Sequence, residues 1–261
     1  MQFLTRPDAQ LHIRDEGPRD GRVVVFANSL GTDLRVWDPL IALLPAGLRI
    51  IRYDKRGHGL SDASPAPYSV ELLVEDAEAL CDHLGVRDVT FIGLSIGGLI
   101  GQGLAAKRPD LVKALVLMDT AAKIGSAEMW NARIAAVREG GLAPMGPAIM
   151  ERWFTAPFRE TRPEFALWTN MLTRTTVEGY VGCCAAIAGA DLTESTRALT
   201  LPVEVLCGDQ DGSTPPDLVR ATAELCGAPF RLIPDAGHIP CVEQPGATAA
   251  LMKDFLERTA A

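Results

Sequence analysis

The chain has 261 residues, of which 48% are hydrophobic and 22% charged, as expected for an ordinary globular protein with a sizeable core. Its formal net charge of −8 argues against nucleic acids and anionic membranes as partners, and an anionic substrate would need a local cation. No apolar run has the length of a membrane span, and the first residues lack the apolar segment of a signal peptide.

The cysteines indicate a reducing compartment. None forms a Cys-x-x-Cys pair, and most stand among apolar residues, as buried free thiols do. We therefore expect no metal site and a cytoplasmic location. The cysteines are Cys81, Cys183, Cys184, Cys207, Cys226 and Cys241.

Apolar runs alternate with helical patterns along most of the chain. This alternation predicts an α/β fold, with a mostly parallel sheet covered by helices on both faces. Strands are expected near residues 2–14 (a strand or an edge hairpin), 23–27, 49–53, 114–118, 203–207 and 230–233, with another starting at residue 89. Helices are expected near residues 70–84, 99–107, 216–226 and 245–258. In such sheets the active site gathers at the carboxyl ends of the strands.

The alternation stops between residues 120 and 197. No buried strand run occurs there, and the segment contains many arginines together with Trp130, Trp153 and Trp168. We interpret it as a helical cap inserted after the sixth strand. The predicted domains are therefore a core of residues 1–119 and 198–261 and a cap of residues 120–197.

A serine stands at a predicted sharp turn from strand to helix. Gly93-x-Ser95-x-Gly97 is the nucleophile-elbow pattern of α/β-hydrolases. The serine must hold a strained backbone to expose its hydroxyl, and side chains two residues before and after it would collide, which explains the glycines. The turn opens a helix, so the N–H of Ile96 is a candidate oxyanion donor.

A nucleophilic serine needs a base, and the base needs an acid that orients it. In proteins with this elbow the chain order is serine, acid, histidine. His238 follows a late strand and an acid-bearing loop, so we predict that it is the base. His12 and His58 precede the serine, and His83 is near a helix end.

Three aspartates at strand ends are candidates for the acid. Asp211 is favoured, because it lies two residues beyond its strand, where a side chain can reach across to His238. Asp209 directly follows the strand and is more suited to binding loop backbone. Asp119, at an earlier strand end, stays open as an alternative.

A second oxyanion donor is expected in residues 28–31, the loop after the first long buried strand. We predict the N–H of Leu30, with a plain tight turn as the alternative. His58 could be a second base, but a structural role is favoured, because a loop this rich in glycine needs internal hydrogen bonds.

Several segments spread over nearly the whole chain share a pattern with one known family. They are residues 28–33, 52–62, 93–98, 119–125, 130–133 and 235–238. Together they resemble the 3-oxoadipate enol-lactonases, bacterial α/β-hydrolases of the protocatechuate and catechol branches of aromatic degradation. The elbow and the Arg-Gly-His-Gly loop are common to many α/β-hydrolases, whereas residues 28–31 and 119–133 are more specific.

The resemblance implies hydrolysis of 3-oxoadipate enol-lactone to 3-oxoadipate in the β-ketoadipate pathway, through an acyl-enzyme and without a metal or organic cofactor. Ser95, His238 and Asp211 would form the catalytic triad. The partner would be a small-molecule lactone, and the protein a monomer or homodimer.

Other activities on the same fold remain open. A carboxylesterase or perhydrolase, or a C–C hydrolase of ring-cleavage products, would use the same triad. A cofactor-free oxygenase and a non-catalytic ligand receptor are more remote alternatives, and an intact triad speaks against the receptor.

The cap is expected to supply the contacts to substrate. At least one of its three tryptophans should cover the lactone ring. The ionised acetate of the lactone needs a cation, and we predict Arg133, because it follows Trp130 by one helical turn and both can face one cleft. The other cations of the segment are Lys123, Arg138, Arg152, Arg159, Arg162, Arg174 and Arg197.

Overall fold

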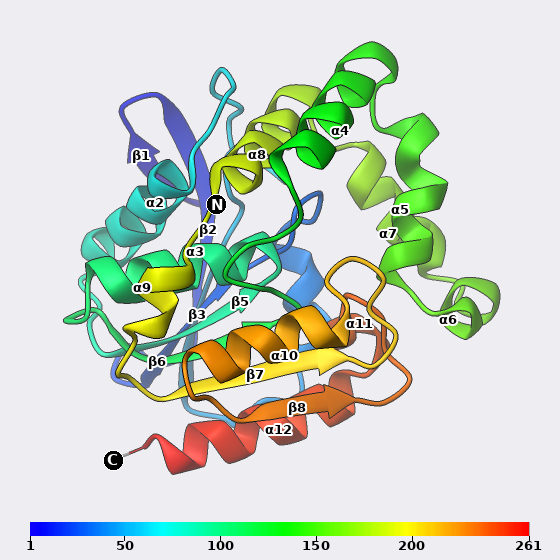
Figure 1. The fold of residues 1–261 in the computed structure, drawn as a ribbon. Helices are drawn as coiled ribbons and strands as arrows, with labels where there is room; N and C mark the ends of the chain where they lie inside the picture. Colours follow the sequence, from blue (N-terminus) through cyan, green and yellow to red (C-terminus); the bar gives the residue numbers. More distant parts are fainter. Residues whose placement is uncertain (261) are drawn as a thin grey trace.

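The chain forms an eight-stranded sheet with helices on both faces (Figure 1). The computed structural model describes residues 1–260. The strand order is β1-β2-β4-β3-β5-β6-β7-β8, with β2 antiparallel to both its neighbours and the other pairs parallel. The strands are β1 (Gln2–Arg6), β2 (Ala9–Glu16), β3 (Arg22–Ala27), β4 (Leu48–Tyr53), β5 (Val89–Leu94), β6 (Val112–Met118), β7 (Val203–Gly208) and β8 (Phe230–Ile233).

The burial of each strand explains its pattern of apolar and polar residues. Every residue of β5 and β7 is buried, and apart from Thr90 and Glu204 these strands carry only apolar residues and glycine, as is typical of interior parallel strands. In β2, by contrast, Ala9, Leu11 and Ile13 are buried and alternate with more exposed residues. The first expected strand is therefore an edge hairpin of β1 and β2.

Two layers of helices cover the sheet. One layer contains α2 (Val70–His83), α3 (Ile96–Lys107), α9 (Thr193–Arg197) and α10 (Pro216–Leu225), which pack in sequence against one another. The other contains α1 (Asp38–Ile41), α11 (Pro240–Glu243) and α12 (Pro245–Arg258). In Figure 1, α10 lies above β7 and β8 and α12 lies below them.

Five helices between β6 and β7 stand apart from these layers, and we call them the cap helices (Figure 1, greens to yellow-green). They are α4 (Ala127–Gly140), α5 (Gly146–Trp153), α6 (Ala156–Thr161), α7 (Phe165–Thr173) and α8 (Val177–Gly189), with the short η2 (Ala143–Met145) before α5. The next helix, α9, packs against α3 of the core, where Thr196 Oγ1 donates to Gln102 Oε1 at 2.6 Å. The division into core and cap at residue 197 stays a prediction.

Three short helices have no counterpart in the sequence prediction: η1 (Leu34–Trp37), α1 and α11. The first begins where the Asp33 side chain accepts a hydrogen bond from the N–H of Arg35. Trp37 is fully buried, with its ring centroid 4.9 Å from that of Phe26. A single turn is too short to show helical periodicity, so tertiary packing decides its conformation.

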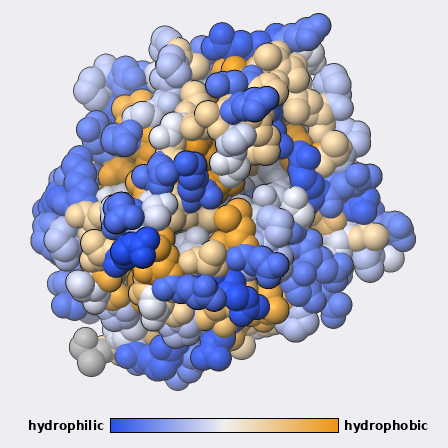
Figure 2. Space-filling view, in the orientation of Figure 1, coloured by the Kyte–Doolittle hydropathy of each residue, from blue (hydrophilic) through white to orange (hydrophobic). Residues whose placement is uncertain are grey.

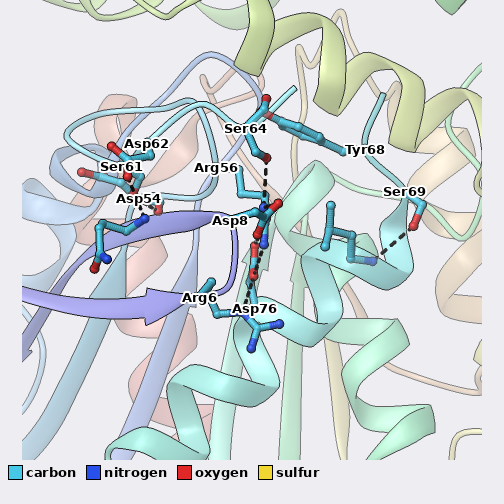
Figure 3. A network of polar contacts seen from close by, with 12 residues as sticks. Arg6, Asp8, Asp54, Arg56, Ser61, Asp62, Ser64, Tyr68, Ser69 and Asp76 are labelled. Atoms are coloured by element: carbon cyan, nitrogen blue, oxygen red, sulfur yellow. Dashed lines mark hydrogen bonds and ion pairs between the residues drawn. The ribbon is translucent and has the colours of Figure 1, made fainter. Parts of the chain in front are cut away.

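A buried ion-pair network anchors the loop after β4 (Figure 3). Arg56, which is fully buried, donates to both carboxylate oxygens of Asp76 on α2, at 2.5 and 2.9 Å. It also donates to Asp8 Oδ2 at 2.7 Å and to Ser64 Oγ at 2.9 Å, while Arg6 donates to Asp76 at 2.9 Å. The network ties the β1–β2 hairpin, this loop and α2 together.

We expect Asp76→Ala to lower the free energy of unfolding by about 3–5 kcal/mol, because it leaves the buried Arg56 guanidinium without its principal partner. Urea unfolding measures the change. Asp110→Ala removes a carboxylate that binds an arginine at the surface and is the matched control, with an expected loss under about 1 kcal/mol. Equal losses in the two variants would contradict this role of the network.

Hydrophilic and apolar residues are interspersed on the face drawn in Figure 2, where apolar side chains appear in separate patches. Scattered apolar exposure of this kind is normal for folded proteins. Among residues 1–260, no helix combines the length and apolar character needed to cross a membrane.

Candidate active site

Ser95 stands on the strained turn between β5 and α3. Its φ of 57° lies in the left-handed region that non-glycine residues rarely adopt. A Cβ at Gly93 would come within 2.2 Å of the carbonyl oxygen of Gly97, and one at Gly97 within 2.0 Å of that of Ala27. Both positions therefore need glycine, because the backbone packs too closely there for a Cβ. The surrounding packing holds Ser95 in its strained conformation at the carboxyl end of β5.

His238 and Asp211 contact each other, and His238 lines the same cavity as Ser95. The two carboxylate oxygens of Asp211 lie 2.9 and 3.0 Å from His238 Nδ1. Asp211 also accepts hydrogen bonds from the N–H groups of Ser213 and Thr214 and from the Thr214 hydroxyl. Burial alone would raise the pKa of Asp211, but His238 and these donors hold it below its usual range. Asp211 is therefore an ionised acceptor that can orient the imidazole ring.

The other two candidate acids are engaged differently. Asp209 Oδ1 accepts the N–H of Ala236 at 3.2 Å, the loop role expected for it. Asp119 Oδ1 accepts the N–H of Gly208 at 2.8 Å, and within residues 1–260 its buried Oδ2 has no hydrogen-bond partner. Burial raises the pKa of Asp119 well above its usual range, and the charge of Asp211 raises it further. Asp119 thus holds its proton to a higher pH than its neighbour Asp211 does.

The second ring nitrogen of His238 faces a cavity of about 320 Å³ that Ser95 also lines. Ser29 Oγ is 3.5 Å from Nε2. The backbone N–H of His238 donates to the Trp153 carbonyl at 2.8 Å. Sequence reasoning did not single out Ser29. Its proximity to the imidazole depends on two loops separated by most of the chain.

Leu30 and Ile96 are the two residues predicted to supply oxyanion donors. Ile96 is the first residue of α3, where a backbone N–H has no partner within the helix. The N–H of Leu30, in the loop after β3, donates no hydrogen bond within residues 1–260, and Leu30 lines the cavity. The N–H of Leu30 can therefore bind an oxygen atom of a ligand in the cavity, and the N–H of Ile96 stays the predicted second donor.

His58 supports this loop from behind. Its Nδ1 is 2.8 Å from the Arg56 carbonyl, and its Nε2 accepts the N–H of Gly31 at 3.0 Å. Burial and the charge of Lys55 lower its pKa well below the usual value, so the ring is neutral and accepts through Nε2. This is the structural role favoured for His58. Because both ring nitrogens are bound to backbone groups, His58 is not a second base.

The cap helices close the cavity with aromatic side chains and two cations. Trp130 and Trp153 line it, whereas Trp168 lines a second cavity of about 590 Å³ near η1. Arg133 also lines the first cavity, with its guanidinium 4.7 Å from the Trp130 ring centroid. Arg152 is the other cation there, and sequence reasoning had not selected it from the arginines of the segment.

A parallel sheet with a strained serine at a strand end, and a His–Asp pair beside it, defines a hydrolase of the α/β class. The family model described as "Alpha/beta hydrolase family" matches residues 24–251, and the chain belongs to this family.

The most similar relatives include two proteins of Acinetobacter baylyi. The chain is 38% identical to 3-oxoadipate enol-lactonase 2, over 97% of this chain and 96% of the relative, and 32% identical to 3-oxoadipate enol-lactonase 1, over 98% and 97%. The crystal structure of the enol-lactonase from Burkholderia xenovorans LB400 matches with a TM-score of 0.94 and 37% identity, covering 98% of this chain and 100% of that one. The resemblance to enol-lactonases, the fold class and the prediction of an ester-hydrolysing enzyme are confirmed.

Proposed function

We propose that this protein hydrolyses 3-oxoadipate enol-lactone to 3-oxoadipate in the β-ketoadipate pathway of aromatic degradation. The observation that carries the proposal is the pair Arg133 and Arg152 in the cavity that Ser95 lines. Within residues 1–260, neither guanidinium forms an ion pair with a carboxylate. Two uncompensated cations in a protein of net charge −8 suit a small substrate that carries a carboxylate.

The proposed reaction begins when Ser95 Oγ attacks the lactone carbonyl carbon and His238 Nε2 takes its proton. The N–H groups of Leu30 and Ile96 stabilise the oxyanion of the tetrahedral intermediate. As the intermediate collapses, the ring C–O bond breaks, and His238 protonates the leaving enolate oxygen. The resulting enol then tautomerises to the ketone, with loss of the oxygen-bound proton and gain of a proton at carbon. Water activated by His238 then hydrolyses the acyl-enzyme and releases the product.

The cap helices and the surrounding loops would bind the substrate. Trp130 and Trp153 supply the apolar wall over the lactone ring, and the arginines bind its acetate. The free thiols, five of them buried, accord with a cytoplasmic location. We propose a monomer or homodimer that acts on a small molecule in solution, with residues 120–197 as its cap.

The direct test is to mix the purified protein with 3-oxoadipate enol-lactone and follow the loss of ultraviolet absorbance. Turnover at catalytic enzyme concentrations supports the proposal. Persistence of the lactone at micromolar enzyme, with rapid hydrolysis of a simple aryl ester, would instead assign a general carboxylesterase.

We expect Arg133→Met to lower kcat/KM for the lactone by roughly 10- to 150-fold, the loss of a charge-assisted contact of about 1.5–3 kcal/mol. On an enol-lactone without the acetate the loss should be small, because that substrate has no charge to bind. Steady-state kinetics on both substrates make the comparison. Arg138→Met, an exposed position on the same helix, is the control.

The same pair of substrates separates the two arginines. If Arg152→Met shows the selective loss and Arg133→Met does not, Arg152 is the anchor. Equal losses on both substrates in Arg133→Met would mean that Arg133 supports the Trp130 ring rather than the carboxylate.

A further inference from the structure

Lys55 is a buried cation behind the loop that carries Leu30. Its side chain is 1% exposed, and Nζ donates to the carbonyl oxygens of Ser29 at 2.5 Å and Thr32 at 3.2 Å. Within residues 1–260 its ammonium forms no ion pair with a carboxylate. Burying an uncompensated ammonium costs free energy, and the mechanism above does not use it. Its position against two carbonyls of one loop therefore calls for an explanation.

The Ser29 carbonyl belongs to the same peptide unit as the N–H of Leu30. In a planar trans peptide, the C=O and N–H bonds point in opposite directions. Lys55 binds the carbonyl end of the unit and does not line the cavity, whereas Ser29 and Leu30 both line it. The N–H end therefore points away from the ammonium, on the side where the candidate oxyanion site lies.

Two other groups hold the same carbonyl. The N–H of Thr32 donates to the Ser29 oxygen at 3.2 Å, and the Thr32 hydroxyl donates to it at 2.9 Å. The orientation of the peptide is thus fixed without the lysine, and the carbonyl keeps partners if the lysine is removed. What Lys55 alone adds is a full positive charge in a region of low dielectric.

We propose that Lys55 is a positioning residue of the oxyanion hole, whose charge polarises the Ser29–Leu30 peptide and makes the Leu30 N–H a stronger hydrogen-bond donor. The inference rests on the proposed function in one respect, because it takes Leu30 as an oxyanion donor. It does not depend on which ester or lactone is the substrate. Because a polarised donor favours the negatively charged intermediate over the neutral carbonyl, the effect belongs to kcat rather than to KM.

Several charged or titratable groups lie around Lys55. Burial lowers its pKa to about 8, while Cys183 on α8, Asp54 and Asp33 oppose this shift. The two carboxylates have other partners, since Asp54 binds His12 and Asp33 binds Arg35. The neighbouring His58 is neutral, as shown above. Lys55 therefore carries its charge at neutral pH and loses it as the pH rises through about 8.

The stability and the activity should respond to this charge in opposite directions. The pKa of Lys55 in the folded protein is below its ordinary value of 10.5, so the unfolded chain binds more protons between pH 8 and that value. Its contribution to the free energy of unfolding therefore increases as the pH rises through this window. Over the same window kcat should fall, because the charge that supports the oxyanion disappears.

The test compares wild type with Lys55→Met, which keeps the length of the side chain and removes its charge. Lys253→Met, at an exposed position on α12, is the control. For Lys55→Met we expect kcat to fall by about 10-fold or more, KM to stay within about 3-fold, and Tm at pH 7 to be no lower than that of wild type. The fall of wild-type kcat above pH 8 should be absent from the variant.

Both the enol-lactone and p-nitrophenyl acetate are used as substrates, so that two failures can be told apart. If wild type hydrolyses only the aryl ester, the proposed lactone is wrong and the role of Lys55 is measured on the ester. Wild-type kcat and an unchanged pH profile in Lys55→Met would overturn the inference, as would parallel losses of kcat and Tm. If the variant does not fold, a wild-type kcat that stays level from pH 7 to pH 9.5 overturns it.

Discussion

Replacing Ser95 or His238 by alanine is expected to lower kcat by about 10³-fold or more in each case. The serine supplies the attacking oxygen, and the histidine supplies the base without which that oxygen stays protonated. Because the two act as one unit, the double variant should lose little more than either single variant. Steady-state kinetics on the enol-lactone measure all three, and circular dichroism checks that each variant is folded.

The matched control is Ser29→Ala. Ser29 Oγ lies 3.5 Å from His238 Nε2, so a hydroxyl other than that of Ser95 is within reach of the proposed base. Ser29 stands on ordinary loop backbone, whereas Ser95 has the strained φ of a nucleophile elbow. We expect Ser29→Ala to keep most of its activity and a serine-directed phosphonate to label Ser95. Labelling of Ser29, or strictly additive losses in the Ser95 and His238 variants, would refute the assignment.

The order of the strand-end loops could be predicted because it depends on local patterns. The apolar runs of β3, β5 and β7 are buried on both faces, so they are recognisable without knowledge of their neighbours. The glycines around Ser95 report close backbone packing that leaves no room for a Cβ. Chain order then led to His238 and Asp211, which the structure places in contact.

The environment of each group could not be predicted in the same way. Lys55 reads as a surface lysine in a polar loop, and its complete burial depends on α8 and the loop after β3 packing around it. Arg152 was one of many cap arginines, and only the orientation of α5 places it in the cavity. The helical spacing of Trp130 and Arg133, by contrast, did predict that they share a face.

Asp211 and Asp119 give the remaining prediction, because they are two carboxyl groups near one imidazole whose pKa values shift in opposite directions. One oxygen of each, together with a ring nitrogen of His238, lies within 4.8 Å of the others. Of the two, Asp211 is the carboxylate within hydrogen-bond distance of His238 Nδ1, whereas burial raises the pKa of Asp119 and favours its protonated form.

We expect Asp211→Asn to lower kcat by roughly 10³- to 10⁴-fold, because an amide cannot stabilise the imidazolium and favours the wrong ring tautomer. Asp119→Asn should stay within about 10-fold of wild type, because the neutral amide resembles the protonated acid and its oxygen can still accept the N–H of Gly208. The measurements are kcat on the enol-lactone and Tm at pH 5 and pH 8 for both variants.

The pH dependence of stability separates the two roles further. The pKa of Asp119 is raised on folding, so the folded state keeps a proton that the unfolded chain loses, and its contribution to stability decreases as the pH rises above the ordinary aspartate value of 3.8. Asp119→Asn removes this cost and should raise Tm more at pH 8 than at pH 5. The pKa of Asp211 is lowered, so Asp211 stabilises the fold above 3.8 and Asp211→Asn should lower Tm at both pH values. If Asp119→Asn were inactive and Asp211→Asn active, Asp119 would be the acid of the triad.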